Sequence, residues 1–229
     1  MSDQIGAVVC LSGGLDSCVT IAEALGRHRE VAALHLTYGQ RTEARELCAF
    51  DAICDHYGVD TRLVARQPAL ADIGDSALVD TAIAVPEEDS GDEIPVTYVP
   101  FRNGQILSIA AAWAEALGAP ELFLGAVEED SSGYPDCREE FFRAFEAAVD
   151  AGTRPETAIR IVTPVLHLDK TAIVRRGLEL GAPFHLTWSC YQDEIRPCGV
   201  CESCRLRAKG FGGAGQIDPL LVQSGNGDQ

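Results

Sequence analysis

A glycine-rich turn near the N-terminus constrains this chain more than any other feature. Residues 5–9 form an apolar run typical of a buried parallel strand, and residues 18–25 have the pattern of a helix. Between them stands Ser-Gly-Gly-Leu-Asp-Ser at residues 12–17, whose paired glycines allow a tight bend with free backbone N–H groups. Ser12 and Ser17 add hydroxyls, and the helix N-terminus adds a partial positive charge. Strand, turn and helix together predict an anion-binding site.

The residues of the turn indicate which kind of phosphate loop this is. The turn lacks the Gly-Lys-Ser/Thr of a Walker A loop, which argues against an ordinary P-loop kinase or GTPase. It resembles instead the PP-loop of enzymes that split ATP between its α and β phosphates to adenylate a substrate. The resemblance implies that ATP is a co-substrate. The implied ATP-binding residues are Leu11, Ser12, Gly13, Gly14, Leu15, Asp16 and Ser17.

Strand-like and helix-like segments alternate through most of the chain. The expected strands are residues 31–38, 61–64, 121–127 and 160–164. The expected helices are residues 41–57, 104–117 and 138–150. This alternation predicts an α/β fold with an open parallel sheet and helices on both faces, as in PP-loop adenine-nucleotide hydrolases. Ligands of such sheets bind beyond the carboxyl ends of the strands, at the point where the strand order reverses.

The chain is expected to have three parts. Residues 1–170 are predicted to form the PP-loop nucleotide-binding domain, and residues 171–211 a helical zinc-binding segment. Residues 212–229 are rich in Gly, Ser, Asn and Asp and are expected to be a flexible tail. Residues 84–98, with prolines and many acids, are expected to be an exposed insertion or a mobile lid.

Composition excludes some classes of partner. The chain of 229 residues has 35 acidic and 18 basic side chains and a net charge of −17, so its surface should repel the phosphates of nucleic acids. Such a surface also suits a high-salt host, where counterions screen self-repulsion. No apolar run approaches the roughly 18 residues of a membrane span, and the N-terminus does not resemble a signal peptide. We therefore expect a cytoplasmic protein with no membrane and no nucleic-acid partner.

Four of the nine cysteines gather near the C-terminus. They are Cys190, Cys198, Cys201 and Cys204. Thiolates two residues apart can bind one ion, and four sulfur ligands fill the shell of Zn²⁺ and leave no open position, so the spacing predicts a structural zinc site. An iron–sulfur cluster is the alternative, because Cys-x2-Cys-x2-Cys also opens ferredoxin motifs. The seven-residue gap and the absence of a following Cys-Pro favour zinc.

The PP-loop, the cysteine cluster and several stretches between them together resemble the 7-cyano-7-deazaguanine synthases, which make the nitrile precursor of queuosine and archaeosine. The further matching stretches are Tyr-Gly-Gln-Arg at 38–41, Thr-Tyr-Val-Pro at 97–100 with Arg102 and Asn103, Ser-Gly-Tyr-Pro-Asp-Cys-Arg at 132–138, Thr-Trp-Ser-Cys-Tyr at 187–191 and Cys-Gly-x-Cys-x-Ser-Cys at 198–204. The stretch at 132–138 discriminates most, because sulfurtransferases, amidotransferases and synthetases share the PP-loop.

The resemblance implies a ligase that forms C–N bonds. ATP and ammonia would convert 7-carboxy-7-deazaguanine to 7-cyano-7-deazaguanine through an adenylated carboxylate and an amide. The implied catalytic residues are Asp16, Ser17, Arg102 and Lys170. Asp16 would act through Mg²⁺, while Arg102 and Lys170 would neutralise the leaving pyrophosphate. Arg102 as a surface arginine and Lys170 as an ordinary first-turn helix residue stay open as alternatives.

The resemblance also implies a substrate pocket and allows a homodimer. The candidate substrate-binding residues are Glu128, Asp130, Tyr134, Asp136 and Cys137. Tyr134, Asp136 and Glu128 would contact the base by stacking on it and by accepting hydrogen bonds from its N–H edge. The residue preferences of a turn explain Tyr-Pro-Asp equally well. Cys137 has no histidine partner nearby in sequence, which favours a pocket wall over a nucleophile.

The chain departs from the family pattern in three places. Phe101 and Gly104 flank Arg-Asn where the family usually has Gly-Arg-Asn-Thr, and Thr42 stands where it has His. Residues 127–130 read Val-Glu-Glu-Asp where the family often has Val-Asn-Ala-x-Asp, which replaces an amide near the expected pocket with an acid.

Two other functions remain as alternatives. A tRNA-thiolating or other tRNA-modifying ligase would use the same PP-loop, but the acidic charge counts against it. A nucleotide-sensing domain with a zinc interaction module would bind ATP without releasing pyrophosphate.

Overall fold

The computed structural model describes residues 4–87, 94–128 and 133–224, and a five-stranded parallel sheet lies at its centre. Along the sheet the strands follow the order β3-β2-β1-β4-β5. Their bounds are β1 Ala7–Cys10, β2 Val31–Thr37, β3 Arg62–Arg66, β4 Glu121–Leu124 and β5 Arg160–Val162. The predicted open parallel sheet of an α/β fold is confirmed. The strand expected at 121–127 ends earlier, at Leu124.

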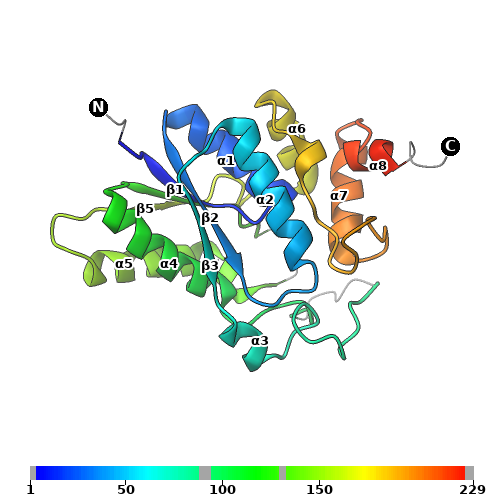
Figure 1. The fold of residues 1–229 in the computed structure, drawn as a ribbon, viewed down its shortest axis with the longest axis horizontal. Coiled ribbons are helices and arrows are strands. Elements are labelled where there is room, and N and C mark those ends of the chain that lie inside the picture. The colour runs from blue at the N-terminus through cyan, green and yellow to red at the C-terminus, as the bar shows by residue number, and fades with distance from the viewer. Residues whose placement is uncertain (1–3, 88–93, 129–132, 225–229) are drawn as a thin grey trace.

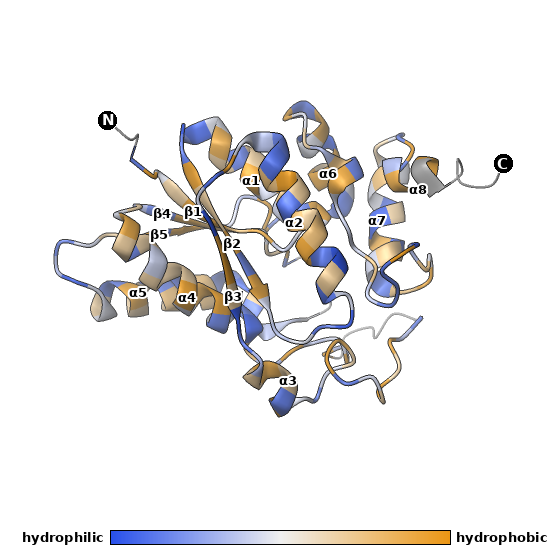
Figure 2. Ribbon diagram, viewed as in Figure 1, coloured by the Kyte–Doolittle hydropathy of each residue, from blue (hydrophilic) through white to orange (hydrophobic). Residues whose placement is uncertain are grey.

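Helices cover both faces of the sheet, as predicted (Figure 1). On one face pack α1 (Leu15–Arg27) and α2 (Glu43–Tyr57), and on the other α4 (Arg102–Leu117) and α5 (Glu139–Gly152). The apolar residues of the central strands alternate between these two cores, because successive side chains of a strand point to opposite faces. Figure 2 shows this arrangement as apolar central strands inside helices of mixed hydropathy.

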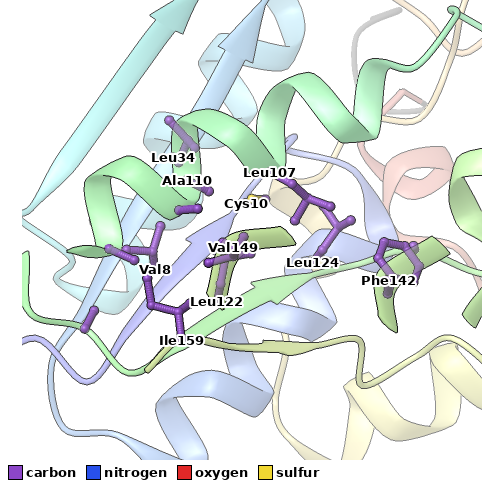
Figure 3. Close-up of a cluster of buried hydrophobic side chains, with 14 of the residues drawn as sticks. Val8, Cys10, Leu34, Leu107, Ala110, Leu122, Leu124, Phe142, Val149 and Ile159 are labelled. Atoms are coloured by element: carbon purple, nitrogen blue, oxygen red, sulfur yellow. The ribbon is translucent and has the colours of Figure 1, made fainter. Parts of the chain in front are cut away.

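The β1 strand illustrates why both faces of the sheet are buried. Val8 and Cys10 join the core beneath α4 and α5, which Figure 3 shows with Leu107, Leu122 and Phe142. Ala7 and Val9 join the core beneath α1 and α2. The whole strand is buried, so a continuous apolar run rather than an alternating one predicted it correctly.

The strand order reverses beside β1 and places the functional loops. The chain runs from β1 through β2 to β3 at one edge, then returns to form β4 and β5 on the other side of β1. The segments after β1 and β4 therefore border one crevice. Gly125 follows β4 there, and a Cβ on it would lie 3.0 Å from the backbone nitrogen of Ser17. The two segments touch because this residue has no side chain.

The C-terminal segment packs beside the sheet domain. Helix α6 (Lys170–Glu179) packs on α1, and α7 (Glu202–Gly213) packs on α6. A short η2 helix, Phe184–Leu186, lies between them in sequence. Gly210 allows the close approach, since a Cβ there would lie 2.8 Å from the Lys170 carbonyl oxygen. Figure 1 shows α6 and α7 side by side next to α1 and α2.

The region expected to be a flexible tail contains a helix. Within residues 212–229 the structure has α8 (Pro219–Ser224), with Leu220 buried. The carboxylate of Asp218 is buried and pairs with Arg207, which fixes the start of α8. The Gly- and Ser-rich composition did not reveal this buried ion pair. Two further elements complete the described residues, namely α3 (Ala69–Ile73) and the short η1 (Pro135–Cys137).

Within the described ranges, no helix combines the length and the apolar character that crossing a membrane would need.

Candidate active site

The PP-loop is held in shape by its own serines and by a glycine. Gly13 has a φ of +87°, and a Cβ on it would lie 2.7 Å from the Glu46 carbonyl oxygen, so only glycine fits. The Gly14 N–H donates to Ser12 Oγ at 3.2 Å, and Ser12 Oγ donates to Ser17 Oγ at 3.1 Å. Both hydroxyls thus lie at the start of α1, where the helix N-terminus favours an anion.

Lys170, which is far from the PP-loop in sequence, contacts it in the folded protein. Its Nζ lies 2.7 Å from Asp16 Oδ2, although the two residues are 154 positions apart. Lys170 begins α6, and the preceding Asp169 caps that helix by accepting from the Ala172 N–H at 2.7 Å. The cap and the close packing of α6 on α7 fix where the ammonium group lies.

The second oxygen of Asp16 is available for a ligand. Asp16 Oδ1 is buried, and no side chain or backbone group in the described ranges hydrogen-bonds to it. Leaving a buried acceptor unsatisfied costs about 1–3 kcal/mol. Carboxylate oxygens are ligands that Mg²⁺ prefers, so Asp16 fits the expected metal of an ATP site.

Arg102 supplies a second positive charge, at a half-buried position. It is the first residue of α4, and its Nη1 donates to Tyr38 Oη at 3.0 Å. The neighbouring Tyr38 hydroxyl holds the pKa of Arg102 above its usual value, so the guanidinium stays charged. Only part of its side chain is exposed, which argues against the surface-arginine alternative.

Phe101 and Gly104, where the chain departs from the family pattern, depend on each other. Phe101 has a φ of +56°, a left-handed conformation that favours glycine. Its ring covers Gly104, so a Cβ at 104 would lie 2.2 Å from Phe101 Cε1. The large side chain at 101 therefore requires the absence of one at 104.

Two adjoining cavities open at this crevice. The first has a volume of about 240 Å³, and its wall includes Ser12, Ser17, Tyr38, Glu46, Trp188 and Arg207. The second has a volume of about 160 Å³, and its wall includes Val127, Tyr134, Cys137, Tyr191, Glu202 and Leu206. Asp16, Arg102 and Lys170 line both cavities and so mark their junction.

The residues proposed for substrate binding are not all at these cavities. Tyr134 and Cys137 line the second one. Burial raises the pKa of Tyr134 to about 12, and its Oη lies 2.8 Å from Thr97 Oγ1. Glu128 lines neither cavity and lies 3.7 Å from His167 Nδ1. Asp130 falls outside the described residues.

Asp136 supports α4 rather than lining a cavity. Its Oδ2 accepts from the Asn103 backbone N–H at 2.9 Å, and its carbonyl oxygen accepts from Asn103 Nδ2 at 2.9 Å. Burial raises the pKa of Asp136. These contacts tie residues 133–138 to the first turn of α4, directly beside Arg102.

Sequence reasoning missed Glu46, a half-buried acid that lines the first cavity. Its two oxygens accept from Thr42 Oγ1 at 2.7 Å and from Gln40 Nε2 at 3.1 Å. Burial raises the pKa of Glu46 above its usual value. Thr42, the second departure from the family pattern, thus serves as a hydrogen-bond donor to this acid. The matching Tyr-Gly-Gln-Arg stretch was the signal that could have led to it.

Sequence reasoning also missed Arg207, which ties the C-terminal segment together. Its Nε and Nη2 donate to the two carboxylate oxygens of Asp218 at 2.7 and 2.9 Å, and its Nη1 donates to Thr187 Oγ1 at 2.6 Å. The next residue, Trp188, donates its N–H to the Gly13 carbonyl oxygen at 2.9 Å. Arg207 thereby supports the segment that touches the PP-loop.

The four clustered cysteines converge as their spacing predicted. All four Sγ atoms lie within 4.8 Å of one another. Cys190 Sγ accepts from the N–H groups of Gln192 and Cys198, each at 3.4 Å. Cys198 Sγ accepts from the Cys201 N–H at 3.3 Å. Such N–H donors stabilise thiolates, so the cluster can hold a metal ion.

The other buried cysteines have a different environment. Cys10, Cys18 and Cys54 lie singly in the core, and burial raises the pKa of each to about 12. They therefore remain protonated, as small core residues do.

Comparisons with known proteins agree on one family. The model of the family described as "Queuosine biosynthesis protein QueC" matches residues 6–215. The 7-cyano-7-deazaguanine synthase of Chlorobaculum parvum is 52% identical over 215 residues, covering 93% of this chain and 95% of that protein. The synthase of Koribacter versatilis is 54% identical over 218 residues, covering 93% of this chain and 92% of that protein.

A solved structure supports the fold alone. A 4-thiouridine synthetase in complex with RNA and bound ATP superposes with a TM-score of 0.51 at 19% identity, covering 95% of this chain and 48% of that one. The sequence matches extend over nearly the whole chain, from the PP-loop through the cysteine cluster. By these matches the chain belongs to the QueC family of queuosine biosynthesis proteins.

Proposed function

We propose that this protein is a 7-cyano-7-deazaguanine synthase. It converts 7-carboxy-7-deazaguanine, ammonia and ATP to the nitrile, with AMP and pyrophosphate as the other products. The observation that supports this best is the junction of two cavities at Asp16, Arg102 and Lys170, beside the PP-loop. The first cavity, which the PP-loop lines, suits ATP, and the second suits a small planar acid. The positive charges of Arg102 and Lys170 at the junction suit a phosphoryl group.

Adenylation solves the chemical problem of this substrate. A carboxylate anion repels nucleophiles, and oxide is a poor leaving group. When a carboxylate oxygen attacks the α-phosphorus, pyrophosphate leaves and the carboxyl carbon acquires AMP as its leaving group. The PP-loop amides and the hydroxyls of Ser12 and Ser17 hold the departing phosphates. Arg102 and Lys170 stabilise the negative charge that develops there. A Mg²⁺ ion held by Asp16 would supply further charge neutralisation.

Ammonia completes the first half of the reaction, which forms the amide, and a second ATP drives the second half, which forms the nitrile. Ammonia adds to the adenylated carboxyl carbon, AMP departs, and a proton is lost to give the primary amide. The amide oxygen then attacks the α-phosphorus of a second ATP. Loss of AMP and two protons from that adduct leaves the nitrile. The same junction serves both activations, because each requires an oxygen on the base to meet an α-phosphate.

The metal of the cysteine cluster is proposed to be Zn²⁺ in a structural role. A tetrahedron with Zn–S bonds of about 2.3 Å places its sulfurs about 3.8 Å apart. Cys198 Sγ and Cys204 Sγ lie 4.0 Å apart. In an iron–sulfur cluster the thiolates bind different irons and are spread around the whole cluster, so close spacing supports a single ion.

Elemental analysis of purified protein tests the zinc assignment. We expect about one zinc per chain, because four sulfur ligands make one closed site. Cys201→Ser should contain less metal than wild type and should unfold at a lower temperature, since a metal ion in a closed site stabilises the fold. Cys48→Ser, at an exposed position on α2, is the matched control and should retain the metal. Iron and sulfide in the wild-type protein would contradict the assignment.

Several further predictions belong to the same proposal. The boundaries at residues 170 and 211, the cytoplasmic location and the homodimer stay predictions. Small molecules are the proposed partners, and the acidic charge supports the absence of a nucleic-acid partner.

Pyrophosphate release tests the function directly. In high KCl with Mg²⁺ and ammonia, the carboxylate should stimulate release and yield AMP and the nitrile, with the amide as intermediate. The amide supplied alone should also be converted. Asp16→Asn should slow both conversions by about a hundredfold, because it loses the Lys170 ion pair and the metal-binding charge. Asp150→Asn on the exposed face of α5 should match wild type. No stimulation by either compound would contradict the proposal, and the tRNA-ligase alternative would be tested next.

A further inference from the structure

The two cavities can be told apart by what lines them. The PP-loop residues Ser12, Gly14 and Ser17 line the first cavity and not the second. The β and γ phosphates of ATP therefore belong in the first. Asp16, Arg102 and Lys170 line both, so the α-phosphate belongs at the junction. Attack in line with the departing pyrophosphate then brings the carboxylate from the second cavity.

The second cavity has the character of a site for a flat heteroaromatic ring. Its aromatic residues are Tyr134 and Tyr191, and its aliphatic residues include Val127 and Leu206. Arg102 and Lys170 stand at the end nearest the phosphates. Among the described residues, the one carboxylate that lines this cavity and not the first is that of Glu202. Glu202 shares this cavity wall with Tyr134.

We propose that Glu202 recognises the pyrimidine edge of the deazaguanine by accepting hydrogen bonds from its ring N–H and its 2-amino group. This inference rests on the proposed function. Two adjacent N–H donors on one edge match the two oxygens of a carboxylate, and such charge-assisted pairs are both strong and selective. The carboxyl group of the substrate projects from the opposite, five-membered ring. Pairing the edge with Glu202 therefore directs the carboxyl group toward Arg102 and Lys170.

The position of Glu202 joins the metal cluster to substrate recognition. Cys201 is the N-cap of α7 and a member of the cluster, and Glu202 is the next residue and the first of that helix. Ser203 and Leu206 of the same helix also line the second cavity. A metal ion bound by the cluster would fix the start of α7 and with it this wall. Glu202 was not among the residues selected from the sequence, where it reads only as a first-turn acid.

Steady-state kinetics of Glu202→Gln test the assignment. The amide keeps the size of the side chain but can accept only one of the two bonds and loses the charge. We expect KM for the carboxylate to rise about 10- to 100-fold, because a charge-assisted hydrogen bond is weakened. KM for ATP should stay within about twofold. Glu140→Gln, at an exposed position on α5, is the matched control and should behave as wild type. Metal content and thermal midpoint are measured for both variants.

A substrate analogue that lacks the 2-amino group gives a second readout that needs no variant. Wild type should use it at least tenfold less efficiently than the parent carboxylate, because one acceptor oxygen of Glu202 loses its donor. Glu202→Gln should narrow this preference, whereas a merely structural role would raise KM for ATP as well or lower the metal content. Equal use of both compounds by wild type, or Glu202→Gln kinetics matching those of Glu140→Gln, would overturn the inference. Wild type that releases no pyrophosphate with the parent compound would overturn the proposed function itself.

Discussion

Single side chains in this protein depend on partners that are close in space and sometimes close in sequence. Phe101 and Gly104 are an example, because the ring at 101 occupies the volume in which a Cβ at 104 would lie. The ring also packs edge-to-face on Phe141, with centroids 5.7 Å apart. Each residue is unusual for its position, but the pair is mutually consistent. It lies on both sides of Arg102, so its packing affects where that guanidinium is held.

Substitutions at these two positions should be strongly non-additive. Gly104→Thr alone must displace the Phe101 ring and should lower the free energy of unfolding by about 1–3 kcal/mol, a typical cost of overpacking. Phe101→Gly together with Gly104→Thr should recover much of that loss, since glycine accepts the left-handed φ without strain. Urea unfolding of the two single variants and the double variant measures the coupling. Simple addition of the single effects would contradict the pairing.

His35 on β2 is a buried group whose ionisation is linked to folding. Its Nδ1 donates to the Leu11 carbonyl oxygen at 3.0 Å, and its Nε2 is buried without a partner among the described residues. Burial lowers the pKa of His35, so the folded protein keeps it neutral below the usual pKa of about 6.5. The unfolded chain takes up that proton first. Stability from this group is therefore complete above about pH 6.5 and decreases as the pH falls from there toward the folded pKa.

Replacing His35 should remove this pH dependence. His35→Asn retains an N–H donor for Leu11 but cannot titrate. Between pH 7.5 and 5.5 the wild type should lose about 1 kcal/mol more unfolding free energy than the variant. Urea unfolding at the two pH values measures the difference. Equal losses in both proteins would show that His35 is not linked to folding in this range.

At the scale of elements, the sequence predicted local patterns well and distant pairings poorly. The burial of β1 on both faces and the turn after it follow from consecutive residues, and both were predicted. The Asp16–Lys170 contact joins residues 154 positions apart; the family resemblance implied that both are catalytic but did not predict that they pair. The role of Asp136 is set by the backbone N–H of Asn103, 33 positions away, which no local pattern reveals. Long-range electrostatic and hydrogen-bond partners are chosen by the packed structure.

Helix α8 is anchored by the buried ion pair between Asp218 and Arg207, and the anchor can be tested. Asp218→Asn should lower the free energy of unfolding by about 3–5 kcal/mol, because the buried Arg207 guanidinium loses its paired charge. Glu179→Gln, which weakens an exposed pair with Arg176, is the control and should cost about 0.5 kcal/mol or less. Thermal and urea unfolding measure both variants. Equal, small effects would mean that residues 212–224 contribute little to the folded state.

Across the whole molecule, the C-terminal segment and the sheet domain form one functional unit. Trp188 donates a backbone hydrogen bond to the PP-loop, Lys170 pairs with Asp16, and Glu202 lines the second cavity. The charge of the chain acts on this unit as a whole. With 35 acidic and 18 basic residues, nearly half of the acidic side chains have no basic side chain to pair with, and their mutual repulsion opposes the compact state.

Salt should therefore stabilise the whole protein by screening. The distance over which charges interact falls from about 10 Å at 0.1 M salt to about 3 Å at 1 M. We expect the midpoint of urea unfolding to rise as KCl increases across this range, and most of the gain should come in the first half because screening saturates. Sucrose stabilises by exclusion from the surface and not by screening, so it separates the two effects. An unchanged or falling midpoint in KCl would show that the acidic side chains are far enough apart for their repulsion to be negligible.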